Sequence, residues 1–415
     1  MQAHIYRVSK AERRVNICVV CRGFKQLCGR KICPILLKAK SAIELEKNLS
    51  KKVVFGASPP SVFVGSWGYP KVSIGPLTPP ISSRNTYLMD SPETWINLNM
   101  DEVLKYRFML VRGKYRVKVA DAMVKNDLIR KIQELAMAVN PTDIEMKLSK
   151  KPRFSLKFSV RDPPSGPSAP IEKLNVAENP KIPKKVDYIV SDIDLKAEKA
   201  TWLLYNHGFK TRQIVRLFSS GLLGLEKNRR FVPTEWSITA VDDILGRNLF
   251  RKVRRNPQIN SYLFFGASAL GNNIQILMMP NVWMFEVLEV WLLTPSAKLE
   301  SDHELWMGRK TYAGKIAGAY YAARLPVLDY LNKIGRQASV VVFIEIYPEW
   351  VPIGVWRIRE LCRKALINTY MKFSSLNEAL SELKNRFKLP FNRWVSKSYV
   401  INFILKQEEI TRFES

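Results

Sequence analysis

The chain has 415 residues, of which 47% are hydrophobic and 11% aromatic, and it carries a formal charge of +29. This composition excludes a disordered chain and predicts two or three folded domains around a large core. The apolar runs are short and interrupted by acids, so we expect a soluble, intracellular, nucleoid-associated protein and no membrane partner. A charge this large favours nucleic acid as the partner, although a basic surface without a dedicated partner is the alternative.

A cluster of cysteines marks the beginning of the chain. Closely spaced pairs of thiolates can complete a tetrahedral shell, so we predict a structural zinc ion. Two disulfides or four ordinary buried cysteines are the alternatives. The four expected ligands are Cys18, Cys21, Cys28 and Cys33.

The same segment is strongly basic. Loops that a metal ion already holds in place would lose less conformational entropy on binding a phosphate backbone, so we expect a nucleic-acid contact here. The alternative is a metal site that only stabilises the fold, with basic residues that bind no ligand. The basic residues concerned are Arg22, Lys25, Arg30 and Lys31.

We expect a mixed α/β protein with short strands in the segment 53–80, which is rich in proline and glycine. Trp67, Tyr69 and Lys71 in that segment could stack on or contact a ligand, and a rigid packed wall is the alternative. The expected divisions are a zinc module (1–45), a Pro/Gly-rich β and helical region (46–162), a Pro-rich linker or crossing loop (163–185), an α/β body (186–400) and a tail peptide (401–415).

The helix expected within 232–255 combines an apolar face with a basic one. Val241, Leu245 and Leu249 share the apolar face. The opposite face would present a ridge of arginines, suited to phosphates on a duplex or simply solvated. The ridge consists of Arg247, Arg251, Arg254 and Arg255.

Acidic pairs precede two of the expected helices. Asp192 with Asp194, and Asp242 with Asp243, could bind a divalent cation, although capping of the helix N-terminus is the alternative. A second metal has no other support in the sequence.

A buried carboxylate is expected in the apolar strand 339–347. Glu345 must be paired there or have a raised pKa. The strand, turn and helix layout favours a site at the end of this strand, formed with Arg324, Arg359 and Glu360, and a structural salt-bridge network is the alternative.

The C-terminal tail contains Gln407, Ile410 and Phe413 at the spacing of the peptide that sliding clamps recognise. Glu414 replaces the second aromatic residue of that pattern, which should weaken docking by about 1–3 kcal/mol. A frayed helix end is the alternative.

Several short sequence motifs resemble those of the Nre family of archaeal DNA repair proteins. They lie at 55–72, 75–80, 179–180, 192–194, 232–243, 308–313, 320–324 and 354–360, and the four-cysteine knuckle agrees with them. The chain departs from the expected family pattern at Glu235, where we expect Arg, and at Ser66-Trp67, where we expect Arg-Tyr. The resemblance implies a role in DNA damage repair in association with the sliding clamp.

Two hypotheses remain open on the sequence. The first is a DNA-binding repair factor with no reaction of its own. The second is an enzyme that acts on nucleic acid or a nucleotide-like adduct with the carboxylates above. Convergence of those carboxylates and arginines on one pocket would favour the enzyme, and their separation would favour the binding protein. A role on RNA is also compatible with the composition.

Overall fold

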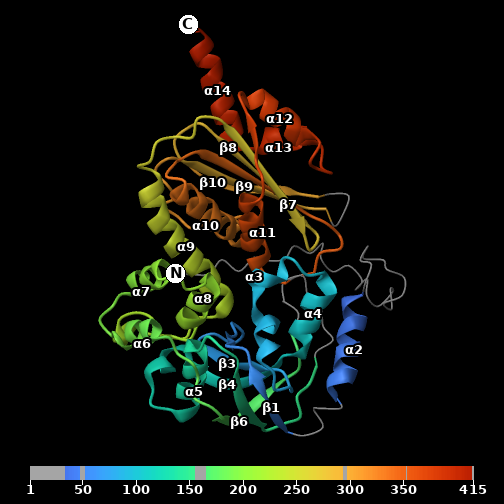
Figure 1. Cartoon of the computed structure of the whole chain (residues 1–415), viewed down its shortest axis with the longest axis vertical. Coiled ribbons are helices and arrows are strands. Elements are labelled where there is room, and N and C mark those ends of the chain that lie inside the picture. The colour runs from blue at the N-terminus through green and yellow to red at the C-terminus, as the bar shows by residue number, and fades with distance from the viewer. Residues whose placement is uncertain (1–32, 47–51, 155–164, 293–296, 352, 414–415) are drawn as a thin grey trace.

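The structure is a computed structural model that describes residues 33–46, 52–154, 165–292, 297–351 and 353–413. The described chain forms two six-stranded mixed sheets, which lie one above the other along the longest axis (Figure 1). Helices cover both sheets and also connect them. The prediction of a mixed α and β protein is therefore confirmed.

The first sheet has the strand order β1-β5-β6-β4-β3-β2. Its neighbouring strands are antiparallel except for β4 and β6. In β5, every second residue is buried, as expected for a strand with one face on a core. The strands are β1 (Val53–Ser58), β2 (Val62–Val64), β3 (Lys71–Thr78), β4 (Val111–Lys118), β5 (Thr142–Leu148) and β6 (Ser168–Val176).

The helices around the first sheet begin at clear capping residues. Asn99 accepts a hydrogen bond from the backbone N–H of Glu102, whose carboxylate accepts one from the backbone of Asn99, and this capping box starts α4. Asn126 caps α5 in a similar way. The helical segments are α2 (Pro34–Glu46), η2 (Arg84–Asp90), α3 (Pro92–Trp95), α4 (Met100–Met109), η3 (Val119–Met123) and α5 (Asp127–Met137).

A group of helices connects the two sheets. The longest is α9, which passes from the first half of the molecule into the second (Figure 1). The apolar face that the sequence predicts for α9 is confirmed, because Val241, Leu245 and Leu249 are buried. The connecting segments are α6 (Lys184–Ser191), α7 (Ala197–Asn206), α8 (Thr211–Ser219), η4 (Glu226–Asn228) and α9 (Thr234–Val253).

The second sheet has the order β10-β9-β11-β8-β7-β12. Its central strand β11 is buried at every residue, pairs with β9 in parallel and with β8 antiparallel, and confirms the predicted two-sided burial. The strands are β7 (Tyr262–Ala269), β8 (Asn272–Met279), β9 (Met284–Trp291), β10 (Leu299–Glu304), β11 (Ser339–Ile346) and β12 (Met371–Phe373).

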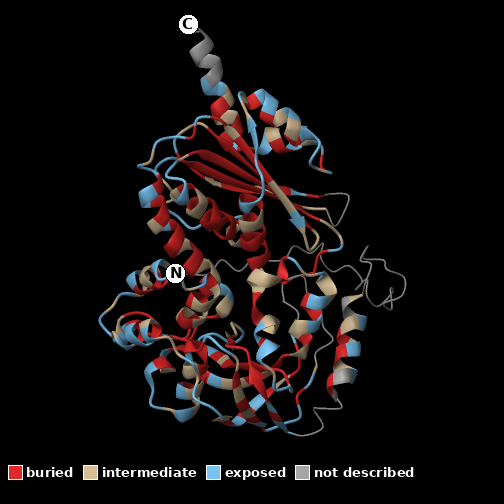
Figure 2. Ribbon diagram, in the orientation of Figure 1, coloured by how far each residue is buried: buried red, intermediate tan, exposed pale blue. Residues whose placement is uncertain are grey.

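The two faces of the second sheet carry different helices. Val340 and Val342 face α10 and α11, whereas Val341 and Phe343 face the C-terminal helices. Figure 2 shows the buried residues concentrated in these central strands. The helices are α10 (Ala317–Lys333), α11 (Trp356–Ile367), α12 (Leu376–Lys384), α13 (Phe391–Lys397) and α14 (Tyr399–Phe413).

The two halves of the described chain share a continuous apolar core. One cluster of buried side chains runs from the first sheet through α8 and α9 to β11. A second contact joins α3 to α11, where the rings of Trp95 and Trp356 meet edge to face at 5.2 Å. Within the described residues, no helix is long and apolar enough to cross a membrane.

The prediction of a linker or crossing loop at 163–185 is wrong for residues 168–176. These residues form β6, which lies between β5 and β4 in the first sheet. The prolines of this segment indicate a loop in the sequence, so the strand was not predicted. Pro170 is tolerated because it lies beside a register shift in the pairing of β5 with β6, where a regular ladder of N–H donors is already interrupted.

The predicted zinc module lies largely outside the described residues. This holds for Cys18, Cys21 and Cys28 and for the basic residues between 22 and 31. Cys33 comes directly before α2. Among the residues that the structure does describe, no group of three or more His, Cys, Asp or Glu side chains could hold a metal ion.

Candidate functional site

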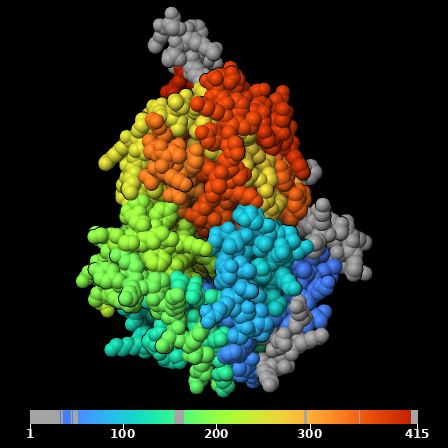
Figure 3. Space-filling view, viewed as in Figure 1, coloured from blue at the N-terminus to red at the C-terminus, as the bar shows by residue number. Residues whose placement is uncertain are grey.

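A cleft of about 530 Å³ lies where the two halves meet. One wall is the turn between α7 and α8, together with the start of α3. The other wall is formed by the end of α10 and by α11. Figure 3 shows these parts of the chain, coloured green, cyan and orange to red, meeting in the middle of one face. The charged lining residues are Glu93, Lys210, Arg212, Asp329, Arg359, Glu360 and Arg363.

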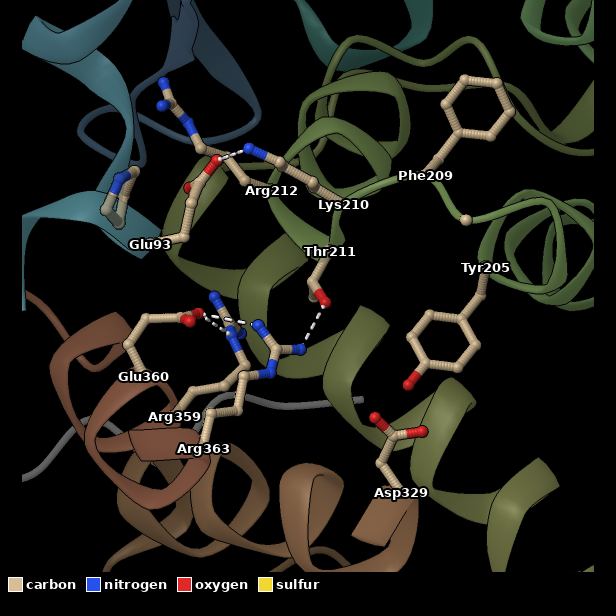
Figure 4. A pocket seen from close by; sticks show the side chains of 12 residues that line it. Glu93, Tyr205, Phe209, Lys210, Thr211, Arg212, Asp329, Arg359, Glu360 and Arg363 are labelled. Carbon is tan, nitrogen blue, oxygen red and sulfur yellow. Dashed lines mark hydrogen bonds and ion pairs between the residues drawn. The ribbon is translucent and has the colours of Figure 1, made fainter. Parts of the chain in front are cut away.

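Ion pairs stabilise each wall of the cleft, and a hydrogen bond connects the two walls (Figure 4). Lys210 Nζ lies 2.7 Å from Glu93 Oε1. Arg363 donates to Glu360 Oε1 at 2.9 Å and to Thr211 Oγ1 at 3.0 Å. Arg363 therefore ties α11 to the first residue of α8, and the cleft is bounded by groups from three separate segments.

A buried ion pair supports the α11 wall from behind. Arg359 Nη1 lies 2.6 and 2.7 Å from the two carboxylate oxygens of Asp242 on α9, and Arg359 Nε lies 3.4 Å from Glu360 Oε1. Burial alone would lower the pKa of Arg359, but the attraction of Asp242 and Glu360 outweighs it and raises that pKa. Arg359 is thus a permanent cation, held in one orientation.

A second hollow of about 570 Å³ adjoins the cleft and shares Glu93, Lys210 and Arg212 with it. Asp90 lies at its wall and accepts from both Arg212 and Arg107. Burial lowers the pKa of Arg216 to about 9, and this side chain donates to the carbonyls of Ala136 and Ala138 at the end of α5. The second hollow is therefore also lined by guanidinium groups.

Tyr205 and Asp329 are a second polar pair at the cleft. Their side chains point toward one another in Figure 4, and they are hydrogen-bonded. Burial and the neighbouring Asp329 raise the pKa of Tyr205, so its hydroxyl stays protonated and donates to the carboxylate. Carboxylates at Asp329 and Glu360 could accept a proton, and Arg363 and Lys210 could hold a phosphate.

Two of the predicted site residues, Arg359 and Glu360, line this cleft, and Asp242 contacts Arg359 from behind it. The others lie elsewhere. Asp242, Arg359 and Glu360 come together as described above. Arg324 instead pairs with Glu304 at 2.8 Å, beneath α9. The predicted grouping of Arg324 with Arg359 and Glu360 is therefore wrong, because α10 turns Arg324 toward β10.

Glu345 also lies apart from the cleft, so it does not form the predicted group with Arg359 and Glu360. It points to the opposite face of β11, where it accepts from Tyr347 Oη at 2.8 Å and from the backbone N–H groups of Lys388 and Leu389 at 3.1 and 2.8 Å. Alternation along a strand decides this outcome, since Glu345 shares its face with Val341 and Phe343. The carboxylate anchors the segment before α13.

The remaining acidic candidates have local partners. Asp192 Oδ1 accepts from the backbone N–H of Asp194 at 3.1 Å, in the turn before α7. Asp243 pairs with Arg247 at 3.1 Å. Neither pair belongs to a group of metal ligands among the described residues.

The predicted arginine ridge is exposed along α9. Arg247, Arg251, Arg254 and Arg255 are all on the solvent side. The ridge is less purely basic in space than in sequence, because Arg247 pairs with Asp243 and Arg251 lies 3.6 Å from Glu198. The pair of Arg251 with Glu198 is exposed and that of Arg247 with Asp243 is partly exposed, so both are weak.

Comparison with known proteins decides the family. Residues 27–296 match the description "Archaeal Nre, N-terminal", and residues 304–413 match "Archaeal Nre, C-terminal". The chain belongs to the archaeal Nre family. No solved structure matches it.

Three curated relatives of this Nre chain are described as DNA repair proteins. NreB of Archaeoglobus fulgidus is 35% identical over 391 residues, which cover 92% of this chain and 96% of the relative. NreA of the same organism is 38% identical over 378 residues, covering 89% and 93%. NreA of Haloferax volcanii is 34% identical over 352 residues, covering 81% and 84%.

The phrases that resemble the Nre family meet around α9. Tyr69 contacts Trp236 with ring centroids 5.1 Å apart, and the backbone N–H of Val64 donates to Thr234 Oγ1 at 3.0 Å. Tyr312 is hydrogen-bonded to Thr239. With the Asp242–Arg359 pair, three segments far apart in the sequence are thereby joined to one helix.

The sequence missed the residues that form most of the cleft. Lys210, Thr211 and Arg212 lie at the start of α8, and Gly208, with a φ of +80°, produces the turn that presents them. Arg363 could have been found, since it follows Glu360 by three residues on one helix. No local sequence pattern indicates Tyr205 and Asp329, because only the packing of both α7 and α10 on α9 brings them together.

Proposed function

We propose that this chain acts in DNA repair by binding DNA, and that its C-terminal helix associates with a sliding clamp. The observation that carries the DNA proposal is the solvent-facing position of four arginines at the end of α9: Arg247 and Arg251 within the helix, and Arg254 and Arg255 directly after it. Guanidinium groups in such a row can contact successive phosphates, and the charge of +29 adds a long-range attraction. The description of three relatives as DNA repair proteins supports the same role.

The clamp proposal rests on the spacing within α14. This helix continues to Phe413, so Ile410 and Phe413 are one turn apart along it. An aliphatic residue and an aromatic residue at this spacing are typical of peptides that dock in an apolar groove, with a glutamine such as Gln407 as a polar anchor.

The DNA proposal is tested by titrating the full chain against labelled single-stranded, duplex and damaged DNA, and against RNA, over a series of salt concentrations. Phosphate contacts predict an affinity that falls steeply as salt rises. A flat response would refute binding through the arginines.

The clamp proposal has a separate test. Removal of residues 407–415 should abolish binding to a purified sliding clamp, and Phe413→Ala should weaken it more than Thr411→Ala in the same helix. Unchanged binding after the truncation would rule this peptide out.

An enzyme that acts on nucleic acid or a nucleotide-like adduct is the second candidate. The specific observation in its favour is the cleft, where Asp329, Glu360 and Arg363 surround a space large enough for a nucleotide-sized ligand. Asp329→Asn should abolish any conversion of a labelled substrate while leaving DNA affinity unchanged. Conversion that is equal in the parent and the variant would exclude this carboxylate.

The predicted zinc ion remains part of this proposal. Cys18, Cys21, Cys28 and Cys33 offer the donor set of a structural zinc site. Metal analysis of the purified chain tests it, since about one zinc ion per chain is expected from four thiolate ligands.

A further inference from the structure

Three exposed aromatic side chains, Tyr69, Trp236 and Tyr312, lie at the beginning of α9, and a fourth, Trp67, is two residues before Tyr69 in the chain. The exposed fractions are 84% for Trp67, 51% for Tyr69, 41% for Trp236 and 63% for Tyr312. Tyr69 and Trp236 are in ring contact, and Tyr312 is bonded to Thr239, one helical turn beyond Trp236. Large rings are costly to leave in water, so a group of them at one place indicates a binding surface.

Cations surround these rings. Arg116 lies over the ring of Trp67 at 5.2 Å. Lys71, the first residue of β3, and Lys310, two residues before Tyr312, are exposed. Glu235 is the exposed acid beside Trp236, and Asp243 is already paired with Arg247. The combination of flat rings and positive charge suits a ligand that is both aromatic and anionic.

The rings and the arginine ridge lie on one side of α9. Trp236, Asp243, Arg247, Arg251 and Arg254 follow one another at intervals of three, four or seven residues, which keep to one face of a helix. From Trp236 to Arg254 this face is about 27 Å long, at 1.5 Å per residue. A ligand that extends over it would meet rings first and guanidinium groups afterwards.

We propose that this surface binds single-stranded DNA, with unpaired bases stacked on Trp67, Tyr69, Trp236 and Tyr312 and phosphates lying along Arg247, Arg251 and Arg254. A duplex hides the faces of its bases, so it could use the arginines but not the rings. The inference rests on the proposed DNA binding and adds the form of DNA that is recognised. It also gives the segment 65–71 a role other than that of a packed wall.

The test measures fluorescence anisotropy of the full chain with a labelled strand of about 15 nucleotides, a length within the range of known single-strand sites, and with its duplex. Trp67→Ala and Tyr312→Ala should each weaken single-strand binding about 5- to 150-fold, the range for one lost stacked base. Duplex binding should change less than about twofold. Tyr312→Phe keeps the ring and should bind like the parent.

Tyr188→Ala is the matched control, because Tyr188 is 68% exposed on α6 and lies beneath Lys185 much as Trp67 lies beneath Arg116. It should leave both affinities unchanged. Glu235→Arg should strengthen single-strand binding, more so at low salt.

The outcomes separate this inference from the proposed function. Equal single-strand affinity in the parent, Trp67→Ala and Tyr312→Ala would overturn the stacking surface, even if arginine-dependent duplex binding persisted. Tighter binding of RNA than of DNA, lost in the same variants, would replace DNA by RNA as the occupant. Absence of binding to every nucleic acid would refute the proposed function itself.

Discussion

The ion pair between Asp242 and Arg359 offers a sharp test of how the cleft is built. The side chains of Asp242 and Arg359 are 1% and 4% exposed, and both carboxylate oxygens contact the same guanidinium nitrogen. Asp242→Ala would leave the nearly buried Arg359 with Glu360, at 3.4 Å, as its remaining acidic partner. We therefore expect a loss of about 3–5 kcal/mol in the free energy of unfolding, as for other buried pairs broken on one side.

Urea unfolding followed by circular dichroism measures this loss as a shift of the midpoint at constant slope. Asp243→Ala is the control on the neighbouring residue. Its pair with Arg247 is exposed, so the expected loss is about 0–1 kcal/mol. The double variant Asp242→Leu with Arg359→Met should return to within about 1 kcal/mol of the parent, because no unpaired charge remains. A loss below about 1 kcal/mol for Asp242→Ala alone would refute the reasoning.

Three further predictions concern other parts of the fold. Glu286 is buried on β9 and accepts from Ser398 and from the backbone N–H groups of Tyr399 and Val400, and burial raises its pKa above 4.5. The folded state therefore binds a proton at Glu286 more readily than the unfolded state does, so the contribution of Glu286 to stability should fall as pH rises above 4.5 toward the raised pKa. This dependence of stability on pH should vanish in Glu286→Gln. An identical pH profile of the two chains would contradict the prediction. In a thermal unfolding assay, Gly75→Ala should destabilise the protein by about 1–3 kcal/mol or more, since the new Cβ in the first sheet would lie 2.2 Å from the carbonyl oxygen of Gly113. Gly314→Ala is the control, because its new Cβ would meet no atom within 4 Å, and its effect on stability should be near zero. Cys18→Ser should lower the zinc content measured by atomic spectrometry, and an unchanged content would remove Cys18 from the ligand set.

Much of the fold could be predicted from local patterns. The apolar run at 339–346 gives a buried central strand, and the spacing of Val241, Leu245 and Leu249 gives the inner face of α9. These predictions succeed because each depends on the period of one element alone. β6 was missed because Pro170 and the neighbouring prolines signal a loop locally, and only its two partner strands reveal it.

The candidate site was less predictable. Asp242 and Arg359 are 117 positions apart, and no pattern in either segment predicts that the two residues form an ion pair. Glu345 was assigned to the wrong side of the sheet, because the sequence shows that a strand is buried on both faces but not which helices cover each face. Sequence phrases therefore identified the important segments, and the packing of α9 against α8, α10 and α11 decided which residues meet.

The most direct test of DNA binding through α9 is the salt dependence of affinity. The full chain is compared with a variant in which Arg247, Arg251, Arg254 and Arg255 are replaced by alanine, with circular dichroism to confirm that both are folded. Each lost phosphate contact should reduce the slope of log affinity against log salt by about 0.9 for a duplex. The account predicts a clearly shallower slope and weaker binding at low salt for the variant. An identical slope for the two chains would contradict it.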